Sequence, residues 1–193
     1  MNHYIDILIK PDAEMRENVL LNKVYSKFHK ALCSLNSTEI GVSFPQYKVK
    51  LGGVIRVHGT DNNFTELENI NWLGGLAGYC NVSEIQVVPS QIAGYRVISR
   101  KQATMNLRKL EKRVQYQKAQ GVLKTQDEVK EYEKQYKAKM YATGLDNPYL
   151  ELDSSSNGHK HRRYIQFGEV VERPIKGEFD TFGLSKIATV PWF

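Results

Sequence analysis

The pattern of apolar and polar positions predicts four strands and two helices in the first half of the chain. Residues 3–9 alternate loosely before Pro11, as in a strand. The next segment is predicted to be helical, because its apolar side chains recur at three- and four-residue steps, at Leu21, Val24, Phe28, Ala31, Leu32 and Leu35. Further strands are expected over 41–45, 54–57 and 85–88, and a second helix over 63–76.

This order, β-α-β-β-α-β, is the ferredoxin-like pattern, which many RNA-binding modules share. We therefore expect an α+β protein with a ferredoxin-like domain over residues 1–94. A fold alone does not establish a function.

The second half begins with a predicted strand over 95–99. A helix with a narrow apolar stripe follows and ends at Gly121, and the capping-box spacing of Thr125 and Glu128 starts another helix. Short strands are expected over 149–152, 164–167, 170–173 and 179–184, with a loop over 153–158. We assign residues 95–193 to a second α+β domain that carries these two helices.

The composition excludes several classes of protein. With 41% hydrophobic and 25% charged residues, the 193-residue chain has an ordinary globular composition. It contains no apolar run of the ~18–20 residues that cross a bilayer, and its first residues lack the pattern of a signal peptide. Cys33 and Cys80 form neither a disulfide framework nor a zinc motif. We expect a cytoplasmic protein with no membrane partner, no metal and no cofactor.

The positive charge is concentrated in one window. The formal net charge is +6, and residues 96–118 alone hold eight basic side chains and one acid, Glu111. The helix predicted there places its basic residues away from its apolar stripe, at Arg108, Lys109, Lys112 and Arg113. The usual interpretation is a solvated, salt-bridged helix face, but the opposite charges at i±4 that this requires are missing.

RNA phosphates neutralise such a helix with release of counterions. A membrane surface is a weaker alternative, because the apolar stripe is narrow and is expected to face the core. Arg100 and Gln102, at the strand-to-helix transition, carry forked side chains that can read base edges. The sequence therefore favours nucleic-acid binding.

Three other features have both a structural and a functional interpretation. His29 lies beside the apolar face of the first helix, where a histidine is usually structural, but a neutral imidazole can accept a proton from a ribose 2′-hydroxyl. The serines at 154–156 are ordinary loop residues or hold that hydroxyl. His159 and His161 lack a third metal ligand and adjoin Arg162, which favours phosphate contact or base stacking.

Short motifs extend from the first residues to the last. They are His3-Tyr-Ile-Asp-Ile-Leu-Ile-Lys-Pro-Asp12, Lys27-Phe-His-Lys-Ala31, Ile40-Gly-Val-Ser-Phe-Pro45, Ser99-Arg-Lys-Gln-Ala103, Ser154-x-Ser156-x-Gly158, Phe182-Gly-Leu-Ser-Lys186 and Val190-Pro-Trp-Phe193. In combination and in this order, they closely resemble the type I-F CRISPR repeat-processing endoribonucleases.

The resemblance implies a ferredoxin-like domain followed by a domain whose arginine-rich helix enters the major groove of an RNA hairpin. It implies cleavage of each CRISPR repeat at the 3′ base of its stem-loop, without metal, to a 2′,3′-cyclic phosphate and a 5′-hydroxyl. The enzyme then stays on the hairpin and joins the other subunits of a type I-F surveillance complex.

The resemblance also assigns site residues by position. His29 matches the catalytic histidine, acting as general base or as electrostatic stabiliser. Ser154 matches the serine that constrains the attacking ribose, and Ser156 lies beside it. Arg100 and Gln102 match a pair that reads bases low in the stem.

Three features depart from the family pattern. Phe182 stands where a catalytic-site tyrosine is expected, so no hydroxyl is available there. His161 stands where a phenylalanine stacks near the scissile nucleotide. Arg113 is retained on the helix, but Tyr116 and Gln117 stand where further arginines are expected. These departures predict a changed hairpin preference and slower cleavage.

Two other functions fit parts of the sequence. A non-catalytic subunit that binds the hairpin of a guide RNA is supported by Phe182, but binding alone does not require His29 or Ser154. A generic ferredoxin-like RNA-binding domain, such as a ribosomal protein, accounts for the basic helix but not for the motifs.

The reduced arginine content of the basic helix predicts a weak dependence of RNA affinity on salt. Each phosphate contact contributes about −0.7 to −0.9 to the slope of log K against log salt concentration. The slope, measured from repeat-RNA binding between 50 and 200 mM salt, should be shallower than that of an arginine-dense family member. An equally steep slope would contradict this expectation.

Overall fold

The computed structural model describes residues 1–102, 105–142, 147–153 and 160–193. The first part of the chain forms β1 (His3–Ile9), α1 (Glu17–Leu35), β2 (Gly41–Ser43), β3 (Val54–Gly59), α2 (Asp61–Asn69), the 3₁₀ helix η1 (Gly74–Tyr79), β4 (Cys80–Val82) and β5 (Gln86–Val87). These strands form an antiparallel sheet, sheet A, in the order β2-β3-β1-β4, and β5 also pairs with β1.

The second predicted helix was extended too far. Thr60 and Asn63 form a capping box that starts α2, but the helix ends at Asn69 rather than at residue 76. Asn71 and Gly74 both adopt positive φ angles, of 43° and 51°, which an α-helix cannot continue through. The chain therefore turns into η1 and then into β4, a strand that the hydrophobic pattern did not predict.

A second antiparallel sheet, sheet B, has the order β7-β8-β6-β9. Its strands are β6 (Gly94–Lys101), β7 (Tyr149–Asp153), β8 (Lys160–Val171) and β9 (Thr189–Trp192). The two strands predicted over 164–167 and 170–173 are the single strand β8. The prediction of a strand over residues 179–184 is wrong, because this segment forms a hydrogen-bonded turn. Together, the two sheets and the helices confirm the α+β class, whereas the ferredoxin-like arrangement stays a prediction.

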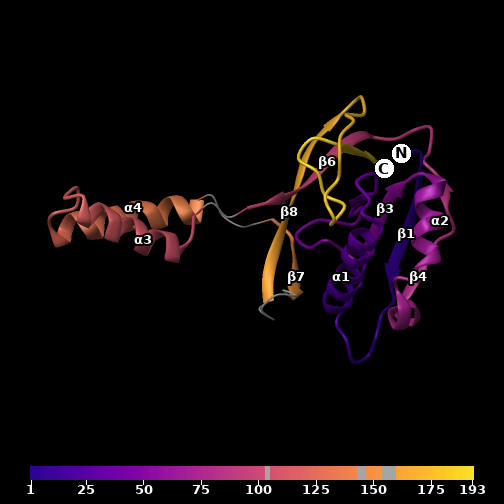
Figure 1. Ribbon diagram of the computed structural model, residues 1–193, viewed down its shortest axis with the longest axis horizontal. Helices are drawn as coiled ribbons and strands as arrows, with labels where there is room; N and C mark the ends of the chain where they lie inside the picture. The colour runs from indigo at the N-terminus through magenta and orange to yellow at the C-terminus, as the bar shows by residue number, and fades with distance from the viewer. Residues whose placement is uncertain (103–104, 143–146, 154–159) are drawn as a thin grey trace. The chain divides into compact units, whose positions relative to one another are not determined.

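One hydrophobic core joins both sheets through α1. This helix contacts β1 and β7 (Figure 1). Its buried side chains are Leu20, Leu21, Val24, Tyr25, Phe28, Ala31 and Leu32. Ile98, Leu150 and Ile165 of sheet B belong to the same core as Ile7 and Ile55 of sheet A. Residues 1–101 and 148–193 accordingly make up one compact unit.

Residues 102–147 form a second compact unit, a pair of helices. In it, α3 (Leu107–Ala119) packs against α4 (Gln126–Ala142) through Leu110, Val114, Val129 and Tyr136. The predicted capping box is confirmed, because Thr125 N–H donates to Glu128 Oε2 and Glu128 N–H donates to Thr125 Oγ1. The division of the chain after residue 94 stays a prediction. None of the helices within the described residues is long and apolar enough to span a bilayer.

Sheet A contains a fully buried histidine. His58 on β3 is 0% exposed, and its Nε2 atom lies 2.8 Å from Ser43 Oγ on β2. Burial lowers the pKa of His58 to about 3, and the positive charges of Arg56 and of the N-terminus act in the same direction. This imidazole is therefore neutral in the folded protein at ordinary pH.

His58 predicts a loss of stability in mild acid. The unfolded chain takes up this proton near pH 6.5, whereas the folded protein excludes it until about pH 3. The free energy of unfolding should therefore fall as the pH decreases through this window, by up to ~1.4 kcal/mol per pH unit. Urea denaturation at pH 7.5, 6 and 5 measures this slope, and His58→Leu should flatten it. A His58→Leu variant with the wild-type slope would refute the assignment.

Candidate active site

The candidate site is built on a tight turn at residues 180–184. Asp180 Oδ1 accepts the backbone N–H groups of Phe182, at 2.8 Å, and of Leu184, at 3.0 Å. Gly183 adopts a φ of +68°, and its carbonyl oxygen accepts the N–H of Val42 on β2, at 2.9 Å. These bonds fix the turn internally and attach it to sheet A.

Two side chains of α1, one helical turn apart, hold the same segment. Tyr25 is fully buried, and its hydroxyl donates to the carbonyl oxygen of Phe182 at 2.7 Å. His29 is half-buried, and its Nδ1 atom lies 2.7 Å from the carbonyl oxygen of Thr181. Burial raises the pKa of Tyr25 far above its usual value, so the phenol remains a donor. Helix and turn therefore position His29 together.

The contact with Thr181 determines which nitrogen of His29 carries a proton. A carbonyl oxygen can only accept a hydrogen bond, so Nδ1 must be the donor. In the neutral imidazole, Nε2 then has the free lone pair. Cys33, one turn further along α1, places its Sγ atom 3.6 Å from Nδ1 and 3.9 Å from Nε2. The geometry leaves Nε2 as the basic atom of the site.

Phe182 lies between a histidine and an arginine. Its ring stacks on the His29 ring, with centroids 3.6 Å apart and planes 8° from parallel. The Arg163 guanidinium carbon lies 3.4 Å from the same Phe182 centroid. One ring face cannot accommodate both groups at these distances, so they occupy opposite faces. The phenylalanine ring thus fixes the separation between imidazole and guanidinium.

The predicted RNA-binding residues of sheet B lie on both of its faces. Alternation along β8 places His161 and Arg163 on the face that packs against α1, and Arg162 on the other. His161 is half-buried, whereas Arg162 is exposed, pairs with Glu151 at 3.2 Å and lies over the Tyr149 ring. The structure therefore does not bring His161 and Arg162 together.

Arg100 is exposed on β6, directly opposite Ile165 of β8. Ile165 and Arg163 share a face of β8, so Arg100 lies on the same sheet face as Arg163. Gln102 follows β6 and is exposed. Ser154 and Ser156 lie outside the described residues.

The predicted basic residues of α3 form one exposed stripe. They are Arg108, Lys109, Lys112 and Arg113. Helical spacing places Tyr116, which is 66% exposed, within this stripe, and Glu111 outside it. An exposed aromatic ring among cations can stack on a nucleotide base, a feature that charge counting alone did not indicate.

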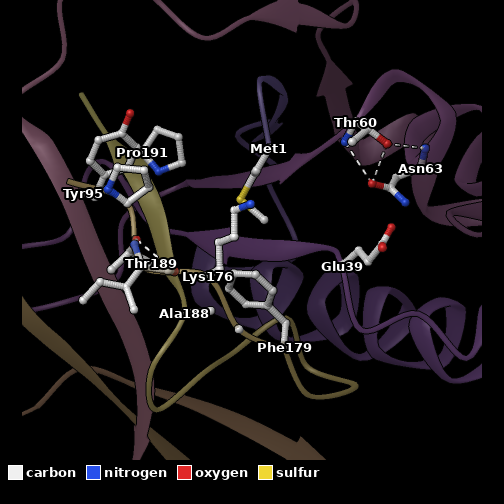
Figure 2. A pocket seen from close by; sticks show the side chains of 13 residues that line it. Met1, Glu39, Thr60, Asn63, Tyr95, Lys176, Phe179, Ala188, Thr189 and Pro191 are labelled. Carbon is white, nitrogen blue, oxygen red and sulfur yellow. Dashed lines mark hydrogen bonds between the residues drawn. The ribbon is translucent and has the colours of Figure 1, made fainter.

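The site carries no metal cluster within the described residues, and it is distinct from the pocket found in the first unit. Within the described ranges, no three His, Cys, Asp or Glu side chains are grouped to hold a metal. A pocket of about 450 Å³ elsewhere in the first unit is surrounded by Lys176, Phe179 and Pro191, among others (Figure 2). None of the predicted site residues is among those that line it. The candidate site around His29 is therefore separate from this pocket.

Sequence reasoning missed the residues that hold His29 in place. Tyr25 reads as an ordinary core position, and the contact with Thr181 spans 152 residues of the chain. Arg163 was not among the predicted site residues. Successive side chains of a strand point to opposite faces of the sheet. The sequence alone could therefore have predicted that Arg162 and Arg163 lie on different faces.

Comparison with known proteins identifies the family. The sequence matches the family model described as "CRISPR-associated protein (Cas_Csy4)" over residues 4–193. The chain therefore belongs to the Cas_Csy4 family of CRISPR-associated proteins. It is 34% identical to an Escherichia coli (strain UTI89 / UPEC) protein named CRISPR-associated endonuclease Cas6/Csy4, over 100% of both chains. A Pseudomonas aeruginosa (strain UCBPP-PA14) protein of the same name is 33% identical, again over 100% of both chains. The resemblance indicated by the sequence motifs is confirmed.

The turn that carries Phe182 should tolerate no side chain at Gly183. A Cβ atom there would lie 3.2 Å from both Phe28 Cε1 and Val42 Cβ, at a φ of +68°. Gly183→Ala should therefore lower the free energy of unfolding by about 1–2 kcal/mol or more. Gly78→Ala is the matched control, because a Cβ atom there meets nothing within 4 Å. Equal urea midpoints for the two variants would contradict this account.

Proposed function

We propose that this protein is an endoribonuclease that cleaves CRISPR repeat RNA at the 3′ base of its stem-loop. The observation that carries the proposal is the geometry of His29, which donates from Nδ1 to Thr181 and keeps Nε2 available as a base. The relatives' printed names, CRISPR-associated endonuclease, support a nuclease. RNA supplies its own nucleophile in the ribose 2′-hydroxyl, so the reaction requires no serine nucleophile and no metal.

In the proposed reaction, His29 Nε2 takes the proton of the 2′-hydroxyl while its oxygen attacks the adjacent phosphorus. The new bond joins the 2′-oxygen to phosphorus, and the bond from phosphorus to the 5′-oxygen breaks. The leaving 5′-oxygen takes a proton from water. The products are a 2′,3′-cyclic phosphate and a 5′-hydroxyl, and the proton on His29 returns to solvent.

The other predicted residues would recognise the RNA. We propose that Ser154 constrains the attacking ribose with Ser156 beside it, that His161 stacks near the cut, and that Arg100 and Gln102 read bases low in the stem. The basic stripe and Arg162 would contact phosphates, where positive charge contributes affinity rather than sequence readout. The stripe consists of Arg108, Lys109, Lys112 and Arg113.

The wider setting is part of the same proposal. The strand order β2-β3-β1-β4, with α1 and α2 as the connecting helices, supports a ferredoxin-like domain over residues 1–94. Residues 95–193 would form the hairpin-binding domain. After cleavage, the protein would remain on the hairpin within a cytoplasmic type I-F surveillance complex and contact its other subunits.

A second function is favoured by one observation. Phe182 stacks on His29 and has no hydroxyl, so it contributes a surface but no proton donor. A subunit that only binds the hairpin of a guide RNA would require no more than this. The two functions differ in whether the bound repeat RNA is cut.

His29→Ala should reduce single-turnover cleavage of repeat RNA in EDTA by about 10²–10⁴-fold while leaving RNA affinity unchanged. His3→Ala is the matched control, since the His3 side chain hydrogen-bonds to its neighbour Asn2 and has no proposed role in the site; this variant should cleave normally. RNA with a single 2′-deoxy nucleotide 5′ to the cut should bind and remain intact. Tight binding without cleavage of the all-ribose RNA would instead establish the non-catalytic subunit.

A further inference from the structure

Arg163 is a buried cation with no anionic partner. The residue is 6% exposed, and within the described parts of the chain no acidic side chain forms an ion pair with it. Its Nε atom is buried and has no hydrogen-bond partner. A buried, unpaired charge is costly, so such a group calls for an explanation.

The protein neighbours of Arg163 do not neutralise it. Burial lowers the pKa of its guanidinium and Arg100 on the same sheet face acts in the same direction, whereas Tyr25 and Asp180 act in the opposite direction without reversing the shift. Asp180 is the nearby acid, but its Oδ1 atom already accepts two backbone N–H groups, and it forms no ion pair with Arg163. The face of Phe182 supplies a cation–π contact, which leaves the N–H donors of the guanidinium unused.

The stacked arrangement of His29, Phe182 and Arg163 also determines where an anion would fit. Phe182 separates the Arg163 guanidinium from the His29 imidazole by the thickness of one ring with a van der Waals contact on each side. A phosphodiester that is hydrogen-bonded on two sides spans a similar distance. A phosphate at the edge of the Phe182 ring can therefore meet the guanidinium on one side while its neighbouring 2′-hydroxyl meets Nε2 on the other.

We propose that Arg163 is a further catalytic residue, which binds the scissile phosphate of the RNA through its guanidinium while His29 takes the 2′-hydroxyl proton. This inference rests on the proposed nuclease function and adds to it the group that holds the phosphate. Arg100 contributes positive charge on the same side.

The chemistry of the reaction explains why a guanidinium is useful there. As the 2′-oxygen attacks, the phosphate passes from one negative charge towards two, so donors fixed around it act more strongly on the transition state than on bound RNA. Arginine is suited to this because its planar fork is always charged and matches two phosphate oxygens. Arg163 is only 6% exposed, so few water molecules compete with a phosphate for the guanidinium.

The test is a binding comparison that does not depend on cleavage. The probe is repeat RNA with a 2′-deoxy nucleotide 5′ to the cut and either a phosphodiester or an uncharged methylphosphonate at the scissile linkage. The wild type should bind the methylphosphonate at least tenfold more weakly. Arg163→Leu should bind both RNAs with equal affinity. Arg173→Leu is the matched control: it removes the same charge from an exposed position that has no proposed role in RNA binding, and it should retain the tenfold difference.

Cleavage provides a second readout. Arg163→Leu should slow single-turnover cleavage of all-ribose RNA by about 10²–10³-fold, and Arg163→Lys should recover part of the rate, because it restores the charge without the fork. Urea denaturation verifies that the variants are folded.

An Arg163→Leu protein that still discriminates tenfold against the methylphosphonate would overturn the inference. So would cleavage by this variant at the wild-type rate. The nuclease proposal is tested separately. If the wild type leaves all-ribose RNA intact but still binds the methylphosphonate more weakly through Arg163, then Arg163 contacts the phosphate, and neither Arg163 nor His29 is catalytic.

Discussion

The hydrogen bond from the Tyr25 hydroxyl to the carbonyl oxygen of Phe182 is the contact on which the site depends. It joins residues that lie 157 positions apart, and it connects the middle of α1 to the turn at 180–184. Together with the bond from Val42 to Gly183, it holds in place the stacking partner of His29 and the carbonyl group that orients its imidazole. The site therefore forms only when the last part of the chain has packed onto the first helix, and its integrity is coupled to that of the whole core.

This long-range origin explains what could be predicted from sequence. Local signals located β1, α1, β3 and the two helices of the second unit, because periodicity and capping act within a few residues. The limits of α2 and the turn at 180–184 depend on left-handed backbone at Asn71 and Gly183, which hydrophobic patterns do not encode. His29 could be selected as a candidate from its residue type and the family motifs. Its partners, Tyr25, Thr181 and Arg163, required the tertiary structure.

The site holds its turn firmly in place but leaves the charge of Arg163 without an ion-pair partner among the described residues. The turn satisfies its own backbone groups through Asp180, whereas the buried Nε atom of Arg163 is left without a hydrogen-bond partner. An apolar side chain of similar size would stabilise the core more effectively at this position. A buried charge of this kind is typical of a surface that binds a partner of opposite charge. The free energy of unfolding is then lower for the free protein than for the complex.

Cys33 gives the protein an intrinsic reporter. Its thiol is exposed and lies within 4 Å of both nitrogens of His29, whereas the other cysteine, Cys80, is buried. A thiol-reactive label would therefore attach to the native sequence beside the imidazole, without the need to engineer a new position. The rate of labelling becomes a measure of how far a bound molecule covers the site, so occupancy can be followed independently of any chemical turnover.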